Sequence, residues 1–265
     1  MPDSPTKTLQ GQTALVTGAS GGIGRAIVRA LASRGAACLV HAHQHRASAE
    51  EAASAITAQG GQALVVTADI AAVRGRETLV DDAWSWRNGV DIWVNNAGAD
   101  ILSGEAGHWP FERKLAELWN VDVQATMLLC REVGRRMQQR GSGVLINVGW
   151  DQAEFGMAGE SGELYAAAKG AVMAFSRSLA RSLAPMVRVN CVAPGWIKTA
   201  WGQEASDYWQ RRAAGEALLG RWGTPDDVAA SVAFLAGPDA AFLTGLCLPV
   251  NGGFAGPYHE PHPGR

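Results

Sequence analysis

Tyr165 and Lys169 are the pair of side chains in this sequence best suited to acid–base chemistry. They are four residues apart in a stretch that we predict to be a helix, Leu164–Leu183, so both side chains lie on one helix face. An ammonium group beside a phenol stabilises the phenolate and lowers the phenol pKa from its ordinary value of about 10. Tyr165 can then give a proton to a carbonyl oxygen or take one from an alcohol. A Tyr-x-x-x-Lys spacing alone is usually an ordinary helix surface, so the remaining sequence must support this interpretation.

A glycine-rich run, from Gly18 to Gly24, lies between a strand-like segment and a predicted helix, Arg25–Ser33. Glycines let the backbone turn tightly and approach a pyrophosphate, and the free N–H groups at a helix start favour its negative charge. The spacing is Gly-x-x-x-Gly-x-Gly rather than the commoner Gly-x-Gly-x-x-Gly. Its position after the first strand predicts a dinucleotide-binding turn.

Short apolar runs alternate with helical stretches along the whole chain, which is typical of a doubly wound parallel sheet. The expected strands contain Ala14–Val16, Cys38–Val40, Ala63–Val66, Ile92–Val94, Val144–Ile146, Val187–Val189 and Leu246–Val250. The expected helices include Arg25–Ser33, Ala49–Ala58, Phe111–Gln139, Leu164–Leu183 and one that begins at the capping sequence Thr224–Asp227. We therefore predict an α/β fold of the Rossmann type: a seven-stranded parallel sheet with helices on both faces. No linker or repeat interrupts the series, so we expect one domain over residues 1–265 with an irregular tail over about 254–265.

Composition excludes several classes of partner. The chain has 265 residues, a formal net charge of −2 and no run of five like charges, so neither nucleic acid nor an anionic membrane is expected to bind. No apolar run reaches the roughly 20 residues that span a bilayer, and the first residues lack a signal-peptide core, so we expect a cytoplasmic protein. The four cysteines have no metal-ligand spacing. The three histidines of His41–His45 lack an evident fourth ligand, so no metal site is predicted.

Further motifs follow in a fixed order along the chain. They are Asp69-Ile70, Asn95–Gly98, Tyr165–Lys169, Asn190–Thr199, Gly220–Pro225 and Thr244-Gly245 with Asn251–Gly253. Together with the glycine-rich turn, this set resembles the short-chain dehydrogenase/reductase family over about residues 8–254, and its pattern is most similar to the 3-oxoacyl reductase branch. The resemblance implies an oxidoreductase that transfers a hydride between a nicotinamide cofactor and a carbonyl or secondary alcohol. It also implies a homodimer or homotetramer built on the two long helices and the last strand.

The resemblance also implies a set of cofactor contacts. These are Gly18, Ser20, Gly22, Ile23 and Gly24 at the pyrophosphate, Asp69 and Ile70 at the adenine, Asn96, Ala97 and Gly98 on the adenosine side, Pro194, Gly195, Ile197 and Thr199 at the carboxamide, and Tyr165 and Lys169 at the nicotinamide ribose. The side chains of Asn95–Gly98 have an alternative role, which is to stabilise the sheet.

The residues after the second strand bear on the choice between NAD(H) and NADP(H). Ala42 stands where an acid would bind the ribose 2′-hydroxyl of NAD, and His43 and Arg46 follow closely. NADP(H) is therefore favoured over NAD(H), with His43 a candidate contact, although Gly21 stands where many NADP-preferring relatives carry arginine.

The sequence departs from the family pattern at two places. No serine follows the fifth strand: Trp150 takes that position when counted from the strand, and Gln152 when counted back from Tyr165. A protonated Asp151 or the amide of Gln152 could donate to the substrate oxygen instead. Asp151 has two alternatives, binding a substrate hydroxyl or amine, or capping the loop. The family's proton-relay asparagine aligns with Asp122.

Two functions remain open from the sequence. The first is a carbonyl reductase or alcohol dehydrogenase with Tyr165 as acid–base residue assisted by Lys169, and with Asp151 or Gln152 holding the substrate oxygen. Its substrate lid is expected over 200–219, where Trp201 and Trp209 favour an apolar or ring-shaped substrate. The second is a nicotinamide-binding protein with little or no turnover, acting as a sensor or assembly subunit.

Overall fold

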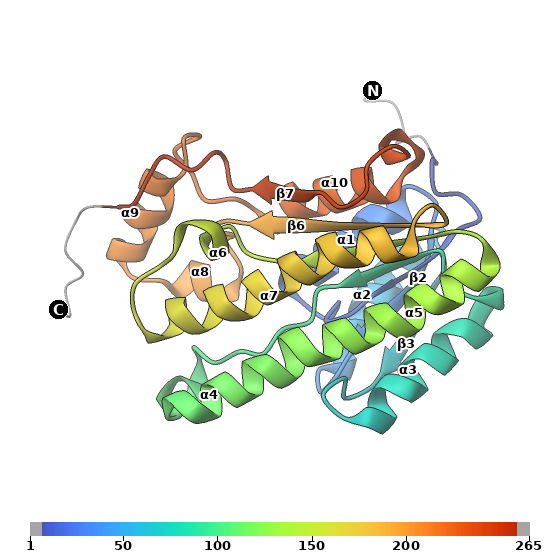
Figure 1. Cartoon of the computed structure of the whole chain (residues 1–265), viewed down its shortest axis with the longest axis horizontal. Helices are drawn as coiled ribbons and strands as arrows, with labels where there is room; N and C mark the ends of the chain where they lie inside the picture. The colour runs from blue at the N-terminus through green and yellow to red at the C-terminus, as the bar shows by residue number, and fades with distance from the viewer. Residues whose placement is uncertain (1–6, 259–265) are drawn as a thin grey trace.

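Seven parallel strands form one sheet at the centre of the computed structural model, which describes residues 7–258 (Figure 1). The strands are β1 (Thr13–Val16), β2 (Ala37–Ala42), β3 (Ala63–Thr67), β4 (Ile92–Asn95), β5 (Gly143–Val148), β6 (Val187–Pro194) and β7 (Cys247–Val250). Their order across the sheet is β3-β2-β1-β4-β5-β6-β7, and every pairing is parallel. The predicted α/β fold and its seven strands are confirmed.

Helices cover both faces of the sheet. They are α1 (Gly22–Ser33), α2 (Arg46–Ala58), α3 (Val73–Ser85), α4 (Phe111–Leu118), α5 (Thr126–Arg140), α6 (Gln152–Phe155), α7 (Glu160–Leu183), α8 (Ala200–Glu204), α9 (Asp207–Glu216) and α10 (Pro225–Ala236). Buried side chains of α1, α2 and α10 form one hydrophobic cluster with the sheet, and those of α3, α5 and α7 form another. The sheet is therefore doubly wound, and α5 and α7 lie side by side on one face (Figure 1).

The strands are apolar on both sides because both faces are covered. In β1, Ala14 and Val16 pack into one cluster and Leu15 into the other, as the two-residue period of a strand requires. All four residues of β1 are buried. The strand thus has no polar face, which explains why the strands occur in the sequence as continuous apolar runs.

Four helices differ from their predicted limits. Two of them, α1 and α2, begin three residues earlier than predicted, at Gly22 and Arg46. The expected helix Phe111–Gln139 is divided by a π-helical segment, Trp119–Ala125, that lies between α4 and α5. The helix α7 begins at Glu160, before the predicted Leu164, because acidic side chains suit the positive end of a helix and Glu160 pairs with Lys114 at 2.9 Å.

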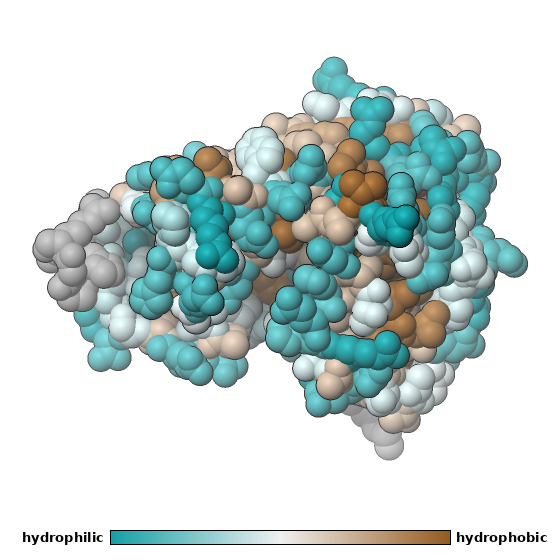
Figure 2. All heavy atoms as spheres, turned by 90° about the horizontal axis from the view of Figure 1, so that it is seen from below, coloured by the Kyte–Doolittle hydropathy of each residue, from teal (hydrophilic) through white to brown (hydrophobic). Residues whose placement is uncertain are grey.

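The expected lid, 200–219, contains α8 and α9. Figure 2 shows the surface hollowed between the end of the molecule that carries these helices and the rest of the protein. Of the expected irregular tail, the structure describes 254–258, which contain no helix, and 259–265 lie outside the described residues.

The start of α10 offers a test of the local sequence signals. Thr224 accepts a hydrogen bond from the Asp227 N–H, and the Asp227 carboxylate accepts one from the Thr224 N–H, which together form a capping box. We predict that Thr224→Ala lowers the free energy of unfolding by about 1 kcal/mol because a helix donor loses its acceptor. Urea denaturation measures this, with Thr57→Ala, an exposed site in the last turn of α2, as control. Equal stability of the Thr224 variant and the wild type would contradict the assignment.

Candidate active site

The side chains of Tyr165, Asp122 and Lys169 lie close together beside the segment that follows β4. The Tyr165 hydroxyl donates to the Ala99 carbonyl oxygen at 3.0 Å, and the Ala99 N–H donates to Asp122 Oδ1 at 2.8 Å. Asp122 Oδ2 lies 2.7 Å from Lys169 Nζ. The helix α7 thus presents Tyr165 and Lys169 to a carboxylate from the π-helical segment, at the carboxyl edge of the sheet.

The π-helical segment places Asp122 in this cluster. A π turn adds one residue to a helical turn and is common at functional sites. Asp122 is 1% exposed, whereas the nearby Asn120 is half-buried and lines a shallow apolar hollow on the outer surface. Gly98 allows the close approach, since a Cβ at that position would lie 2.8 Å from Asp122 Oδ2. The alignment of Asp122 rather than Asn120 with the relay position agrees with this geometry.

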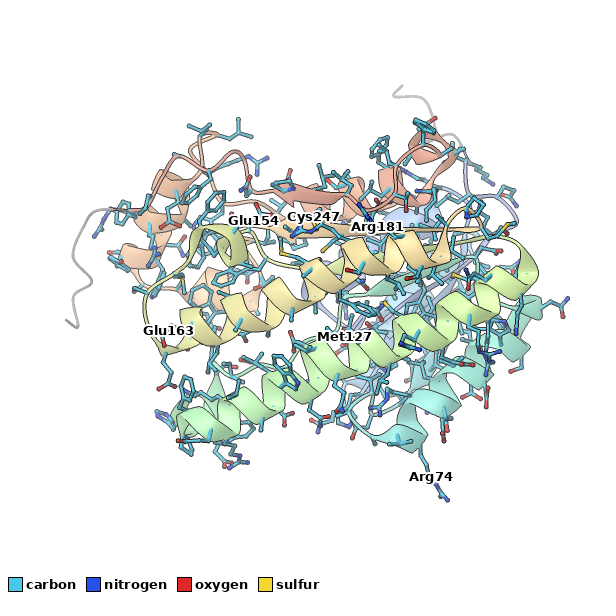
Figure 3. All side chains as sticks on the ribbon, in the orientation of Figure 1. Arg74, Met127, Glu154, Glu163, Arg181 and Cys247 are labelled. Carbon is cyan, nitrogen blue, oxygen red and sulfur yellow. The ribbon has the colours of Figure 1, made fainter. Side chains whose placement is uncertain are left out.

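Apolar packing holds α7 in place around Tyr165. Met127 of α5 lies between α5 and α7 (Figure 3) and packs against a small cluster that includes Leu164 and Ala168. These two residues flank Tyr165 and Lys169 in sequence. The orientation of the catalytic candidates is therefore fixed by the packing of α7 on its neighbour.

The surroundings of Tyr165 raise its pKa above the ordinary tyrosine value. Burial is the largest cause, and the negative charge of Asp122 adds to it. From the four-residue spacing alone, Lys169 was expected to lower this pKa. In this structure the Lys169 charge is paired with Asp122, so the expected stabilisation of a phenolate is offset.

The glycine-rich turn forms a cradle for an anion. No side chain caps the start of α1, and its first turn contains no acidic residue, so its N–H groups and dipole favour an anion. Gly22 has a φ of +51°, and a Cβ at Gly24 would lie 2.2 Å from the Gly18 carbonyl oxygen. Side chains are excluded at both positions, which leaves the backbone open to a pyrophosphate. The residues present therefore fit a dinucleotide.

Comparison with known proteins agrees with the geometry. Residues 18–255 match the family model described as Enoyl-(Acyl carrier protein) reductase. The 3-oxoacyl-(acyl-carrier-protein) reductase FabG of Vibrio cholerae is 38% identical over 247 residues, which cover 92% of this chain and 98% of that protein. The structure of a short-chain dehydrogenase/reductase from Serratia marcescens is 35% identical, with a TM-score of 0.85 and coverage of 94% of this chain and 100% of that one. The chain belongs to the short-chain dehydrogenase/reductase family. It is an NAD(P)-binding oxidoreductase fold, as the sequence motifs predicted.

A second solved structure carries a different substrate. It is a 7α-hydroxysteroid dehydrogenase complexed with NADH and 7-oxo glycochenodeoxycholic acid, 29% identical, with a TM-score of 0.86 and coverage of 96% of this chain and 98% of that one. The fold of this family thus serves both acyl-carrier and steroid substrates, so the fold alone does not identify the substrate.

Asparagines support the cofactor side of this short-chain dehydrogenase/reductase. Asn96 Nδ2 donates to the carbonyl oxygens of Thr17 and Gly18, at 3.0 and 3.1 Å, and so braces the glycine-rich turn. Asn95 is buried and donates to Asn147 Oδ1 at 2.8 Å. The Asn95 side chain therefore stabilises the sheet, which is the alternative role given above. The Asn96 side chain stabilises the glycine-rich turn.

His41 is a structural residue that sequence reasoning missed. Its Nδ1 accepts the Gly18 N–H at 3.2 Å, so Nε2 carries the proton and donates to the Ala68 carbonyl oxygen at 3.0 Å. Burial lowers the pKa of His41 to about 4, so the ring is neutral at physiological pH. The sequence analysis considered this residue only as a metal ligand. Within residues 7–258, no three His, Cys, Asp or Glu side chains are grouped to hold a metal ion.

The residues predicted to contact the adenine and a 2′-phosphate lie at the ends of β2 and β3. Ala42 is fully buried at the end of β2, and His43 is exposed directly after it. Asp69 Oδ1 accepts the Ala71 N–H at 2.9 Å, while the Ile70 side chain is 5% exposed and packs into the core. A cofactor contact of Ile70 would therefore come from its backbone or the edge of its side chain.

The loop after β6 reaches back to the glycine-rich turn. The Thr199 methyl group lies 3.6 Å from the position of a Cβ at Gly22. Ile197 is buried and bridges to Gly223, and a Cβ at Gly195 would lie 2.6 Å from Asn251 Cβ. The structure therefore brings the residues predicted for the carboxamide next to those predicted for the pyrophosphate.

Trp150 is the residue after β5 that contacts Tyr165. Their ring centroids are 6.2 Å apart in an edge-to-face arrangement. Asp151 Oδ2 instead accepts Asn251 Nδ2–H at 3.0 Å, and Gln152 Nε2–H donates to Glu216 Oε2 at 3.3 Å. The structure thus places Trp150 beside Tyr165 and pairs Asp151 and Gln152 with the end of β7 and the lid.

Glu216 anchors the lid and was also missed from the sequence. Its carboxylate is 3% exposed and accepts hydrogen bonds from Trp196 Nε1–H at 2.6 Å and Arg212 Nε–H at 2.8 Å. The Arg212 guanidinium lies over the rings of Trp196 and Trp209, at 5.5 and 5.1 Å. Many lid aromatics therefore pack on one another. The only sequence signal was the four-residue spacing of Arg212 and Glu216.

Asp151 offers a test through pH. Burial raises its pKa to about 6, and the Asn251 amide partly offsets this. A folded-state pKa above the unfolded value means that the folded state loses relative stability as pH rises through about 6. We predict that Asp151→Asn, which keeps an acceptor for Asn251, removes this loss and is more stabilising at pH 8 than at pH 4.5 by about 2 kcal/mol, because about 1.4 units of the pKa shift are expressed between these two pH values.

Urea denaturation of both proteins at the two pH values measures the difference. The exposed Asp239→Asn serves as the control, because the same chemical change at the surface should alter the unfolding free energy little. An effect of Asp151→Asn that is independent of pH would rule out the burial of an ionisable carboxyl group.

Proposed function

We propose that the protein is a carbonyl reductase or alcohol dehydrogenase that prefers NADP(H), with Tyr165 as general acid and base and Lys169 as its helper. The observation that carries the proposal is the convergence of both side chains at the carboxyl edge of the sheet, next to the turn that fits a dinucleotide. Membership in the short-chain dehydrogenase/reductase family supports the same chemistry.

A bound nicotinamide supplies or accepts the hydride. In the reductive direction Tyr165 gives its hydroxyl proton to the substrate carbonyl oxygen, and in the oxidative direction it takes the alcohol proton. Lys169 is the residue that would hold the ribose hydroxyls of the cofactor. The Trp150 ring forms one wall beside the phenol and excludes water from that side.

Asp151 and Gln152 complete the proposal as the residues that bind the polar groups of the substrate. Asp151 Oδ1 is buried and has no hydrogen-bond partner within the described part of the chain. Because the pKa of Asp151 is raised to about 6, its protonated form is accessible near neutral pH and can donate to an oxygen. Gln152 has one amide N–H on Glu216, which leaves its other polar groups for a second contact.

The lid supports an apolar or ring-shaped substrate. Trp196 packs with Trp201, Trp209 and Trp222 at centroid distances of 6.3, 5.4 and 6.1 Å. Flat aromatic surfaces bind apolar rings well because they bury large area at small entropic cost. The relative bound to a bile acid gives a precedent for such a substrate within the family.

An exposed apolar strip supports the expected homodimer or homotetramer. Phe111, Leu115, Trp119 and Leu128 are between 39% and 49% exposed and lie along α4, the π-helical segment and the start of α5. Clustered exposed apolar side chains mark contact surfaces. We propose that a second copy of the chain covers this strip.

Replacement of the tyrosine tests the proposed chemistry. We predict that Tyr165→Phe lowers kcat for NADPH-dependent carbonyl reduction by about 10²–10⁴-fold, because the proton donor is lost while the ring packing remains. Quenching of the intrinsic tryptophan fluorescence should show that NADPH affinity falls by less than about tenfold, because Tyr165 is only one of the predicted cofactor contacts. Full activity of the variant would contradict the role of Tyr165, and cofactor binding without any turnover by the wild type would favour the binding-only alternative.

The residues after β2 support NADP(H) and offer a second test. No acid follows β2 directly, and His43 is exposed there with Arg46 three residues later. We predict that His43→Asp weakens NADPH binding by about tenfold or more and leaves NADH binding unchanged or tighter, because the new carboxylate repels a 2′-phosphate and suits a 2′-hydroxyl. His108→Asp, the same change at an exposed distant site, controls for net charge. Equal effects of the two variants on NADPH would contradict the assignment.

A further inference from the structure

We propose that Asp122 is a positioning residue that holds the Lys169 ammonium and offsets its charge, so that Tyr165 stays a phenol, the form that donates a proton in carbonyl reduction, over the neutral pH range. The inference rests on the proposed function for the roles of Tyr165 and Lys169. It adds a role for the Asp122 charge and a pH dependence that neither the motifs nor the relatives supply.

The position of Asp122 shows that its carboxylate is built into the site. Asp122 is 1% exposed, and both of its oxygens are used: Oδ1 accepts the Ala99 N–H at 2.8 Å and Oδ2 lies 2.7 Å from Lys169 Nζ. A carboxylate at this depth is stable only with a cationic partner. Gly98 leaves room for it, because any Cβ there would lie 2.8 Å from Oδ2.

Within residues 7–258, Lys169 forms an ion pair with Asp122. Its side chain is 13% exposed, and its Nζ pairs with Asp122 at the inner end. An asparagine at position 122 could accept the Ala99 N–H in the same way but would leave the Lys169 charge uncompensated. Compared with asparagine, the carboxylate therefore changes the charge of the site but keeps the hydrogen bond from the Ala99 N–H.

Tyr165 experiences the sum of these charges. Lys169 lies one helical turn away on α7, Asp122 faces Tyr165 from the π-helical segment, and Asp100 faces it from the loop after β4. The loop after β5 contributes the uncharged Trp150. One ammonium and two carboxylates leave a net negative charge around the phenol. Together with burial, this raises the pKa of Tyr165, whereas a lone ammonium would lower it.

The pH dependence of reduction and of oxidation follows from the proton on Tyr165. Carbonyl reduction needs the phenol, which donates its proton to the substrate oxygen, and alcohol oxidation needs the phenolate, which accepts one. A site that disfavours the phenolate retains its reductive form over the neutral pH range. The oxidative reaction is then expected to require alkaline pH.

The charge state of Tyr165 can be measured without cofactor or substrate. The full chain contains three tyrosines, so ¹³Cζ-tyrosine labelling yields three NMR signals, and Tyr165→Phe assigns one of them. We expect the wild-type Tyr165 signal to remain that of a phenol at about pH 10, the ordinary tyrosine midpoint. We expect the Asp122→Asn signal to move to the phenolate position at a pH lower than in the wild type by about one unit or more, a tenfold change in the acid dissociation constant.

Asp100→Asn is the matched control, because it removes the same charge from an exposed side chain close to Tyr165. The change that Asp100→Asn causes in the titration midpoint of Tyr165 should be less than half the change caused by Asp122→Asn. Three results would overturn the inference: a wild-type Tyr165 that titrates at or below the ordinary tyrosine value, an Asp122→Asn variant that titrates no earlier than the wild type, or equal shifts in the two asparagine variants.

A second variant keeps the test decisive if Asp122→Asn does not fold. Lys169→Met leaves Asp122 as an uncompensated charge, so the Tyr165 signal should titrate later still than in the wild type, and an earlier titration would overturn the inference. Activity is a separate readout: the pH at which alcohol oxidation begins should fall in Asp122→Asn by the same amount as the NMR midpoint. If the wild type turns over no carbonyl or alcohol, the proposed function fails, while the NMR titration still decides the inference.

Discussion

A buried carboxylate must be paired, and the pairing of Asp122 with Lys169 determines how the elements of the site come together. Asp122 Oδ2 and Lys169 Nζ lie 2.7 Å apart, and this ion pair joins the π-helical segment to α7. The second oxygen of Asp122 fixes the backbone at Ala99, which in turn accepts the Tyr165 hydroxyl. Removing one partner of such a pair costs about 3–5 kcal/mol because it leaves a buried charge without compensation. The glycine at position 98 and the extra helical residue are needed to bring these groups together.

The sheet supplies the frame on which this cluster stands. Because all strands are parallel, their carboxyl ends meet at one edge, where β1 leads into the glycine-rich turn, β4 into Ala99, and β5 into Trp150. Buried polar side chains connect these loops: His41 braces the turn from β2, and Glu216 joins the lid to the loops after β5 and β6. Each loop at the edge is thus held by a hydrogen bond to a buried group rather than by packing alone.

The sequence predicted features that depend on local patterns. Continuous apolar runs predicted the strands, since both faces of the sheet are buried, and the position of Gly18–Gly24 after β1 predicted the anion cradle. The four-residue spacing of Tyr165 and Lys169 placed both on one face of α7. Each of these signals involves residues that are close together in the sequence. It can therefore be recognised without knowledge of the folded structure.

Features that depend on distant partners could not be predicted in the same way. The charge on Lys169 is balanced by a residue 47 positions earlier, so its expected effect on the Tyr165 pKa was reversed only when the fold brought Asp122 to it. A π turn has no sequence signature, so the division of Phe111–Gln139 was not expected. Likewise, Asp151 gains its partner Asn251 from the turn that follows the last strand.

A double-mutant cycle on Asp122 and Lys169 tests the central claim most directly. The unfolding free energies of the wild type, Asp122→Asn, Lys169→Met and the double variant are measured by urea denaturation at pH 7. The account predicts a coupling energy of more than about 1 kcal/mol, because each single change leaves the other charge buried and unpaired, while the double change does not. Additive effects, within about 0.5 kcal/mol, would show that the two groups are independent and would contradict the account.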